Sequence, residues 1–490
     1  MLPIQSFSQQ LIWSDAARNE RAIDNVRAVA QIDTTLHIIE EREDHIIRHV
    51  RYGWNSMRQL HSSDIEPANK HTRPAHFFVL NDTLHILSTR WNREEGCTEV
   101  LASRYDSAGL LVGAQVLVHK RYENGEPRTS GLQFKLSPND SLVLLYFDND
   151  NERKQSEGIH FKCFRTNWEV VWEKDLRLPP AGDILQVHHF LIDNEGGVYM
   201  MSGRKPLKTS SDWQRPQGGQ YVVYYYNFKQ NKLKQYDISL KDKQVISVDF
   251  ALNKNQDIII AGYYSDNFQN KAAGTLLFTI GNKGGTIQTA SYTPFSDDFM
   301  KVMTGKEKGD LEYLYLDHLH VTTSGVIVLA GEQYYTSRYI STDPTTGRQI
   351  VEYRYNFDDI MLCMMDSNAR HLHTVRIPKR QFTSGTNDPN FSYAFAANEE
   401  RISITFNDDE ENNSSEPSKK WQEAALWNGS KSSVTTRVEL LYDGSWTRRT
   451  LVDNNKERLL FNPLMQPSDP WSSDVLGFDD KRTYKFCRIR

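Results

Sequence analysis

The feature that most constrains the fold is a pair of short apolar runs that recurs seven times along the 490 residues. A turn of three to five residues separates the two runs, and it is rich in Gly, Asn and Asp, which supply the backbone conformations that tight hairpins need. The first run has the form Phe-x-Leu or a close variant, and it begins at Ala30, Phe78, Phe134, Phe190, Phe250, Leu319 and Phe395. The second run of each pair covers residues 36–39, 84–87, 142–145, 198–201, 258–261, 326–329 and 402–405.

Each unit continues with a second hairpin, such as residues 100–105 and 110–116 around the turn at Asp106, so that one unit holds four strands, A to D. Successive units begin 48, 56, 56, 60, 69 and 76 residues apart. Four short strands per unit at this spacing are typical of β-propeller blades, whereas tandem immunoglobulin-like domains need about 100 residues each. The sequence therefore predicts an all-β fold, a β-propeller of four-stranded antiparallel blades.

The chain ends predict how the ring is closed. Three further strand-like runs follow the seventh unit, at residues 459–463, 474–478 and 483–489, and residues 10–13 can supply the missing fourth strand. Pairing of the N- and C-terminal strands in one blade removes free sheet edges. We expect eight blades in a single domain over residues 9–490, and seven blades are the alternative if residues 20–66 or 455–490 prove irregular.

Residues 1–8 resemble the end of a secretory signal peptide, with apolar residues followed by Ser6 and Ser8 at the positions that precede a cleavage site. This segment predicts export, and an ordinary N-terminus is the alternative. The mean hydropathy is −0.62, and no stretch has the roughly 18–20 apolar residues of a transmembrane helix. The charge balance of 58 − 63 = −5 argues against nucleic acid as a partner, since phosphate binding needs a basic surface.

Long connections fall almost entirely between strands B and C and between strands D and A, which emerge on the same face of a propeller. The B–C connections include residues 332–353 and 407–433, and helices are expected at residues 296–303 and 418–427. Trp, Tyr and Arg dominate the energetics of protein interfaces. The candidate partner-binding residues are Trp91, Arg93, Trp213, Arg215, Tyr264, Tyr334, Tyr335, Arg338, Trp421 and Trp427. In the alternative, these rings fold back and fill the space between loops.

The sequence predicts no catalytic residue, no metal site and no cofactor. The histidines at the starts of A strands, His76, His188, His189 and His318, belong to different blades, so we expect a polar channel there rather than convergent ligands. The alternating oxygens of residues 148–152 lack the glycine and the final glutamate of a calcium-binding EF-hand loop.

The repeat units that begin at Phe190 and Phe250 resemble the blades of large exported bacterial β-propellers, and the Ser-Phe-Ser-Gln-Gln start is similar to signal ends in bacteria with type IX secretion and gliding machinery. This resemblance implies a periplasmic, outer-membrane-associated or cell-surface location. We expect a non-catalytic scaffold that binds a protein partner in a cell-envelope assembly. The alternative is a glycan-binding or glycan-active propeller, a hydrolase or lyase.

Overall fold

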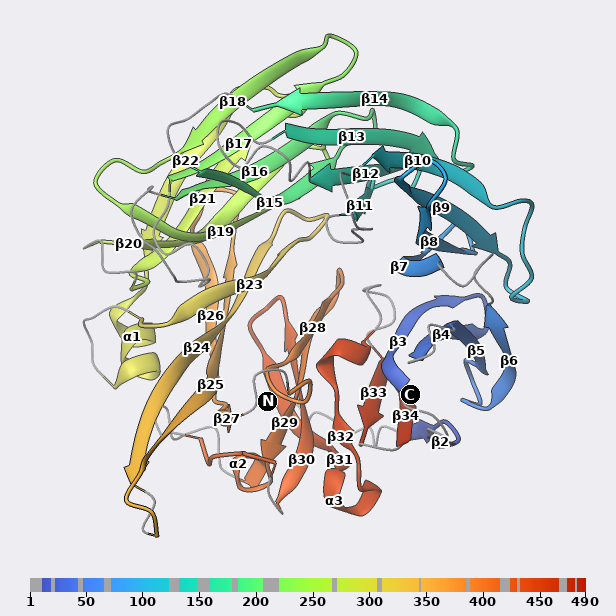
Figure 1. Cartoon of the computed structure of the whole chain (residues 1–490). Helices are drawn as coiled ribbons and strands as arrows, with labels where there is room; N and C mark the ends of the chain where they lie inside the picture. Colours follow the sequence, from blue (N-terminus) through green and yellow to red (C-terminus); the bar gives the residue numbers. More distant parts are fainter. Residues whose placement is uncertain are drawn as a thin grey trace.

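Eight four-stranded antiparallel sheets are arranged as blades around a central axis in the computed structural model of the chain (Figure 1). The structure describes residues 11–18, 23–42, 47–65, 72–122, 132–148, 158–178, 184–205, 220–266, 271–305, 311–342, 345–384, 388–414, 424–429, 432–466, 474–480 and 483–490. All seven repeated hairpins of the sequence are the two inner strands of a blade, so the predicted propeller is confirmed.

The first four blades follow one another along the chain. Blade 1 comprises β3 (Ile23–Ile32), β4 (Thr35–Arg42), β5 (Ile47–Gly53) and β6 (Gln59–Ile65). Blade 2 comprises β7 (Thr72–Leu80), β8 (Thr83–Asn92), β9 (Cys97–Tyr105) and β10 (Val116–Tyr122). Blade 3 comprises β11 (Leu132–Leu136), β12 (Leu142–Asp148), β13 (Gly158–Arg165) and β14 (Val170–Arg177). Blade 4 comprises β15 (Ile184–Ile192), β16 (Val198–Lys205), β17 (Gln220–Asn227) and β18 (Lys232–Ile238).

The next three blades have the same order, with longer strands in blade 6. Blade 5 comprises β19 (Gln244–Leu252), β20 (Ile258–Ser265), β21 (Gly274–Ile280) and β22 (Ile287–Pro294). Blade 6 comprises β23 (Leu314–Val321), β24 (Ile327–Thr342), β25 (Gln349–Met365) and β26 (His371–Ile377), and β27 (Gln381–Thr383) is added to the edge of β25. Blade 7 comprises β28 (Ala394–Ala397), β29 (Arg401–Asp409), β30 (Ser433–Leu441) and β31 (Trp446–Asp453).

Blade 8 is built from both ends of the chain. It comprises β32 (Leu460–Phe461), β33 (Val475–Asp479), β34 (Thr483–Ile489) and β1 (Leu11–Trp13), with β2 (Ala17–Arg18) also on β34. Strand β1 pairs with β34 in antiparallel register, with Leu11 opposite Ile489 and Trp13 opposite Cys487. The predicted eight blades with paired termini are thus confirmed, because residues 23–42 and 47–65 form a regular four-stranded blade of their own.

Side-chain packing joins the blades. Eight apolar clusters lie one at each junction between neighbouring blades, and the cluster between blades 8 and 1 brings Val475 and Phe486 against Leu36 and Ile38. Strands in the middle of a blade are covered on both faces, which explains why β20 is buried along its whole length and reads Ile-Ile-Ile-Ala.

The two faces of the ring differ. On the plain face, the A–B turns contain left-handed residues such as Asp33, Asn81 and Gly196, as their composition predicts. Neighbouring turns are also linked, because the Asn139 amide donates to Asn194 Oδ1 (3.0 Å) and the Thr323 amide donates to a Glu399 carboxylate oxygen (3.0 Å).

The elaborated face carries the long connections. The predicted helix at residues 296–303 is α1 (Asp297–Thr304), capped by Ser296, whose Oγ accepts from the Phe299 amide. The helix expected at residues 418–427 is wrong where it can be seen, since Ala424–Trp427 are not helical: the Ala425 amide donates to Asn412 Oδ1 and the Trp427 amide donates to the Arg380 carbonyl. The short helices α2 (Glu411–Ser414) and α3 (Asn454–Glu457) also lie in connections of this face, whereas η2 (Pro463–Met465) lies in the A–B connection of blade 8. Among the described residues, no helix is both long and apolar enough to cross a membrane.

Candidate functional site

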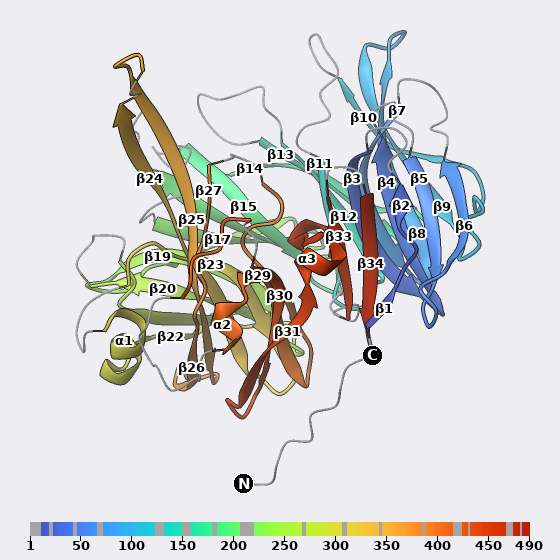
Figure 2. The same ribbon diagram turned by 90° about the horizontal axis from the view of Figure 1, so that it is seen from below.

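The most prominent feature of the elaborated face is a hairpin that continues beyond blade 6. Strand β23 pairs with β24 only as far as Gln333, and β27 pairs with β25 only over residues 355–357. Beyond these points, β24 and β25 pair with each other alone, and Figure 2 shows them rising clear of the neighbouring blades. We call residues 334–342 and 349–357 the β24–β25 arm.

One face of the arm is apolar and exposed. The antiparallel register places Arg338 opposite Tyr353 and Ile340 opposite Val351, so these four side chains share one face. Ile340 is 55% exposed, Tyr353 52% and Val351 41%, and Arg338 is also exposed. We call these four residues the arm face. Exposed apolar surface of this kind marks interaction sites more often than surface chosen at random does.

The opposite face of the arm carries polar side chains that make contacts of their own, together with the exposed Tyr339 (46%) and Ile350 (50%). The Arg354 guanidinium lies 4.1 Å from the centroid of the Tyr339 ring and 4.8 Å from that of Phe382 in β27. Arg354 Nε also donates to Glu352 Oε1 (3.1 Å), which accepts from Ser384 Oγ (2.6 Å). These contacts brace one face of the arm, whereas among the described residues the four side chains of the arm face make no ion pair or ring contact.

The root of the arm is fixed by a buried ion pair. Lys379 Nζ lies 2.6 Å from Glu332 Oε1, and both side chains are almost inaccessible to solvent. Glu332 Oε2 accepts from Ser392 Oγ (2.8 Å), and Lys379 Nζ also donates to the Phe357 carbonyl (2.9 Å). Burial raises the pKa of Glu332, an effect that the Lys379 charge opposes.

A tyrosine at the root is held in its neutral form. Tyr335 donates from its hydroxyl to Asp358 Oδ2 (3.0 Å), and its ring packs on Tyr313. Burial, together with the Asp358 charge, raises the pKa of Tyr335 to about 12. The hydroxyl therefore serves as a hydrogen-bond donor at neutral pH.

The structure brings together three of the predicted partner-binding residues. Tyr334, Tyr335 and Arg338 all lie on the arm, although Tyr334 is half-buried against Phe357 at its root. Trp91, half-buried at the end of β8, and Arg93, exposed in the following turn, lie apart from them in blade 2.

Two other candidates are interior residues. Trp427 is fully buried, packs on Phe391 and donates from Nε1 to Ser433 Oγ (2.9 Å). Tyr264 is 1% exposed and packs on Tyr292. These two rings fill space beneath the connections, so they offer no surface to a partner and are left out of the candidate site. Trp213, Arg215 and Trp421 lie outside the described residues.

Ile340, Val351 and Tyr353 are not among the predicted partner-binding residues, because residues 332–353 were expected to form a long B–C connection. The alternation of apolar and polar side chains from Val351 to Phe357 was the available signal, since a period of two residues is that of a strand. A solvent-exposed hairpin lacks the continuous apolar run that identified the other strands.

The channel histidines have other partners. His189 Nδ1 lies 2.7 Å from Asp249 Oδ1, His76 Nε2 lies 2.7 Å from the Leu132 carbonyl oxygen, and His318 stacks on Phe395. Bulges in the inner strands, for example at Val29 and Ile246, turn residues away from the axis into the junctions between blades. The His188 side chain and residues 149–152 lie outside what the structure describes.

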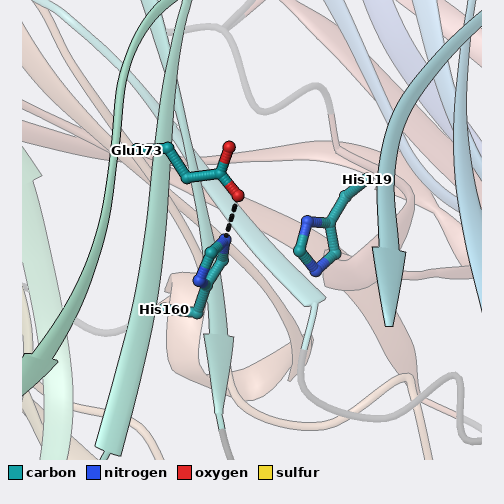
Figure 3. A group of neighbouring side chains, drawn as sticks. All are labelled: His119, His160 and Glu173. Atoms are coloured by element: carbon teal, nitrogen blue, oxygen red, sulfur yellow. Dashed lines mark ion pairs between the residues drawn. The ribbon is translucent and has the colours of Figure 1, made fainter. Parts of the chain in front are cut away.

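A different group of side chains could hold a metal ion. His119 on β10, His160 on β13 and Glu173 on β14 each offer a ligand atom, and these atoms lie within 4.8 Å of one another (Figure 3). Burial, with the nearby charges of His160 and Lys162, lowers the pKa of His119 to about 4, so its imidazole is neutral at pH 7.

No protein-family model matches the chain, and a search of curated proteins found no match. Among solved structures, the chain is similar to the Dos1 propeller, with 8% identity, a TM-score of 0.43, and coverage of 97% of this chain and 95% of that one. It is similar to the β-propeller domain of the Trilobed protease from Pyrococcus furiosus, with 9% identity, a TM-score of 0.38, and coverage of 91% and 99%. A third is an ulvan lyase of a polysaccharide lyase family, with 10% identity, a TM-score of 0.37, and coverage of 85% and 91%. Likeness at this level concerns the fold, so what these proteins do is not transferred.

Proposed function

We propose that this propeller is a non-catalytic scaffold that binds a protein partner through the arm face. The observation that carries the proposal is the cluster of Ile340, Val351 and Tyr353 beside Arg338 on a hairpin that projects beyond the ring. Covering exposed β-branched and aromatic side chains with a partner lowers the free energy, because apolar surface is removed from water. Tyr and Arg are also enriched among interface hot spots.

The construction of the arm supports the proposal. The face opposite the arm face is braced by Arg354 and Glu352, and the root is fixed by the ion pair of Lys379 and Glu332. A surface held in place before binding loses less conformational freedom when the complex forms. The arm is thus a preorganised projection rather than a loose loop.

The pair of carboxylates at the root of the arm is poorly placed for glycan cleavage. Asp317 and Glu332 approach each other at the root, where the Glu332 amide donates to Asp317 Oδ2 (3.0 Å). Glu332 is only 4% exposed and is committed to Lys379 and Ser392, so it is not presented to a sugar. Hydrolysis would need two carboxyl groups facing each other across a substrate. Export and membership of a cell-envelope assembly are carried into the proposal from the sequence.

The test compares capture of partners by matched variants. The tagged full-length wild type, the double variant Ile340→Ser/Tyr353→Ser and a control variant are each purified from native cells. The control is Leu110→Ser, which changes a 66% exposed residue in a turn of blade 2 on the plain face. We expect a stoichiometric protein partner with the wild type and the control. The arm variant should bind the purified partner at least about tenfold more weakly, as measured by surface plasmon resonance.

Two outcomes would contradict the proposal. The first is a partner that binds the arm variant as tightly as the wild type. The second is the absence of any stoichiometric partner together with measurable affinity for a glycan, which would favour the glycan-binding alternative.

A further inference from the structure

The junction between blades 2 and 3 holds a group of side chains that the proposed function does not use. We propose that His119, His160 and Glu173 bind a divalent transition-metal ion of the zinc type and so link the two blades. His119 comes from the outer strand of blade 2, whereas His160 and Glu173 come from neighbouring strands of blade 3, and Figure 3 shows the three side chains turned toward one another.

The donor set suits zinc. Two imidazole nitrogens and one carboxylate oxygen are a common set of three protein ligands, with a water molecule in the fourth position. At zinc–ligand distances of about 2.0–2.1 Å and tetrahedral angles, neighbouring ligand atoms lie about 3.3 Å apart. His160 Nε2 and Glu173 Oε1 are 3.1 Å apart, so these two ligands are already at the required separation. His119 needs only a side-chain adjustment, since all the ligand atoms lie within 4.8 Å.

A fourth residue orients His160. Asp175 lies directly opposite His160 on β14, and its Oδ1 lies 2.8 Å from His160 Nδ1. A carboxylate in this position accepts the Nδ1 proton and leaves the lone pair on Nε2, the atom that faces Glu173. His160 Nε2 is buried and makes no well-aligned hydrogen bond among the described residues, and the ion-pair contact it makes is with Glu173 Oε1, the other proposed ligand of blade 3.

The floor of the site is apolar and rigid. The His119 ring stacks on Phe147 with centroids 4.2 Å apart, and Phe147 also contacts the His160 ring. Glu173 is on the solvent side, with 43% of its side chain exposed. An ion can therefore enter from solvent beside Glu173, and a water ligand can occupy that side.

The positive charges of Lys162 and Arg121 oppose the cation, and Lys162 is in contact with a proposed ligand. Lys162 Nζ lies 3.1 Å from Glu173 Oε2, the carboxylate oxygen that does not face His160. Its charge leaves Glu173 Oε1 free to act as a ligand but lowers the affinity for a cation through repulsion. Removal of this charge should strengthen metal binding, a response that a purely structural ion pair would not give.

The experiment uses the full-length protein after treatment with a chelator and dialysis. Zinc is titrated by calorimetry, and cobalt(II) is then added as a spectroscopic probe of the coordination geometry. We expect one zinc per chain and a rise in the melting temperature with zinc, because the ion binds the folded chain. His119→Gln and Glu173→Gln should each weaken zinc binding at least about tenfold, and Asp175→Asn about 10- to 100-fold. Lys162→Gln should strengthen it.

The control is His61→Gln, which changes an exposed histidine of blade 1 and should leave the affinity unchanged. Circular dichroism establishes that each variant is folded. Glu173 and Asp175 lie on β14, the outer strand of blade 3, with 43% and 76% of their side chains exposed, so the test does not depend on variants of buried residues alone. The proposal is overturned if no stoichiometric zinc binds, or if binding is the same in the wild type, Glu173→Gln and Lys162→Gln.

Discussion

The inner and outer halves of the β24–β25 hairpin share one antiparallel register but have different environments. In the inner half, residues 327–332 and 360–365 are all buried, and side chains of the two strands belong to the apolar clusters on both sides of blade 6. In the outer half, the strands remain paired but no blade covers the arm face. The ring therefore ends where the packing between blades and the pairing of β23 and β27 end, and β24 and β25 stay paired with each other beyond that point. Under the proposed function, this additional length of paired strand binds the partner.

The largest expected loss of stability follows from a substitution at the boundary between the two halves, at the buried ion pair of Lys379 and Glu332. Lys379→Met should lower the free energy of unfolding by about 3–5 kcal/mol at pH 8, because it leaves the Glu332 carboxylate buried without a counter-charge. The measurement is urea unfolding followed by circular dichroism. The double variant Glu332→Gln/Lys379→Met should recover part of the loss, since no charge is then left unpaired.

The same variant should depend on pH in a defined direction. Burial raises the pKa of Glu332 above the 4.5 of the unfolded chain, and loss of Lys379 raises it further. In the pH range between the unfolded pKa of Glu332 and its pKa in the folded variant, the folded variant binds more protons than the unfolded chain. The free energy of unfolding of the variant therefore increases as the pH falls through that range. The difference in free energy of unfolding between the wild type and Lys379→Met should be smaller at pH 5 than at pH 8. An equal difference at both pH values would contradict this account.

The second expected effect is a difference in stability between matched substitutions in the inner and the outer half. Leu362→Ala in the inner half should lower the free energy of unfolding by about 2–5 kcal/mol, because the side chain is 1% exposed and its loss leaves a cavity. Ile340→Ala in the outer half should change it by no more than about 0.5 kcal/mol, since Ile340 is 55% exposed. Urea unfolding measures both variants, and equal losses would mean that the arm is part of the core.

The contrast also explains what the sequence could predict. Each blade begins with an apolar run, a turn of fixed chemistry and a second apolar run, and these features are local, so the seven repeats were recognised one by one. The eighth blade followed from counting strands at the two ends of the chain, and the pairing of Leu11 with Ile489 confirms it.

The candidate site was predicted less well, because burial depends on distant residues. Trp427 and Arg338 both belong to residue types that occur at interfaces, yet Trp427 is enclosed by Phe391 and Ser433 whereas Arg338 is exposed. The metal-binding group has no local motif at all, since His119 and His160 are 41 residues apart and meet only when blades 2 and 3 pack together.

The smallest expected effect concerns the rigidity of the arm. Arg354→Ala should remove the stacking on Tyr339 and Phe382, contacts worth about 0.5–1 kcal/mol at an exposed site. We expect amide exchange within residues 334–357, measured by mass spectrometry, to become about two- to fivefold faster, with global stability nearly unchanged. Arg338→Ala is the matched control, because it changes an arginine on the opposite face of the same strands and should leave exchange as it is. If strand pairing alone kept the arm in place, the two variants would behave alike, and the distinction between a braced face and a face that is available for binding would be lost.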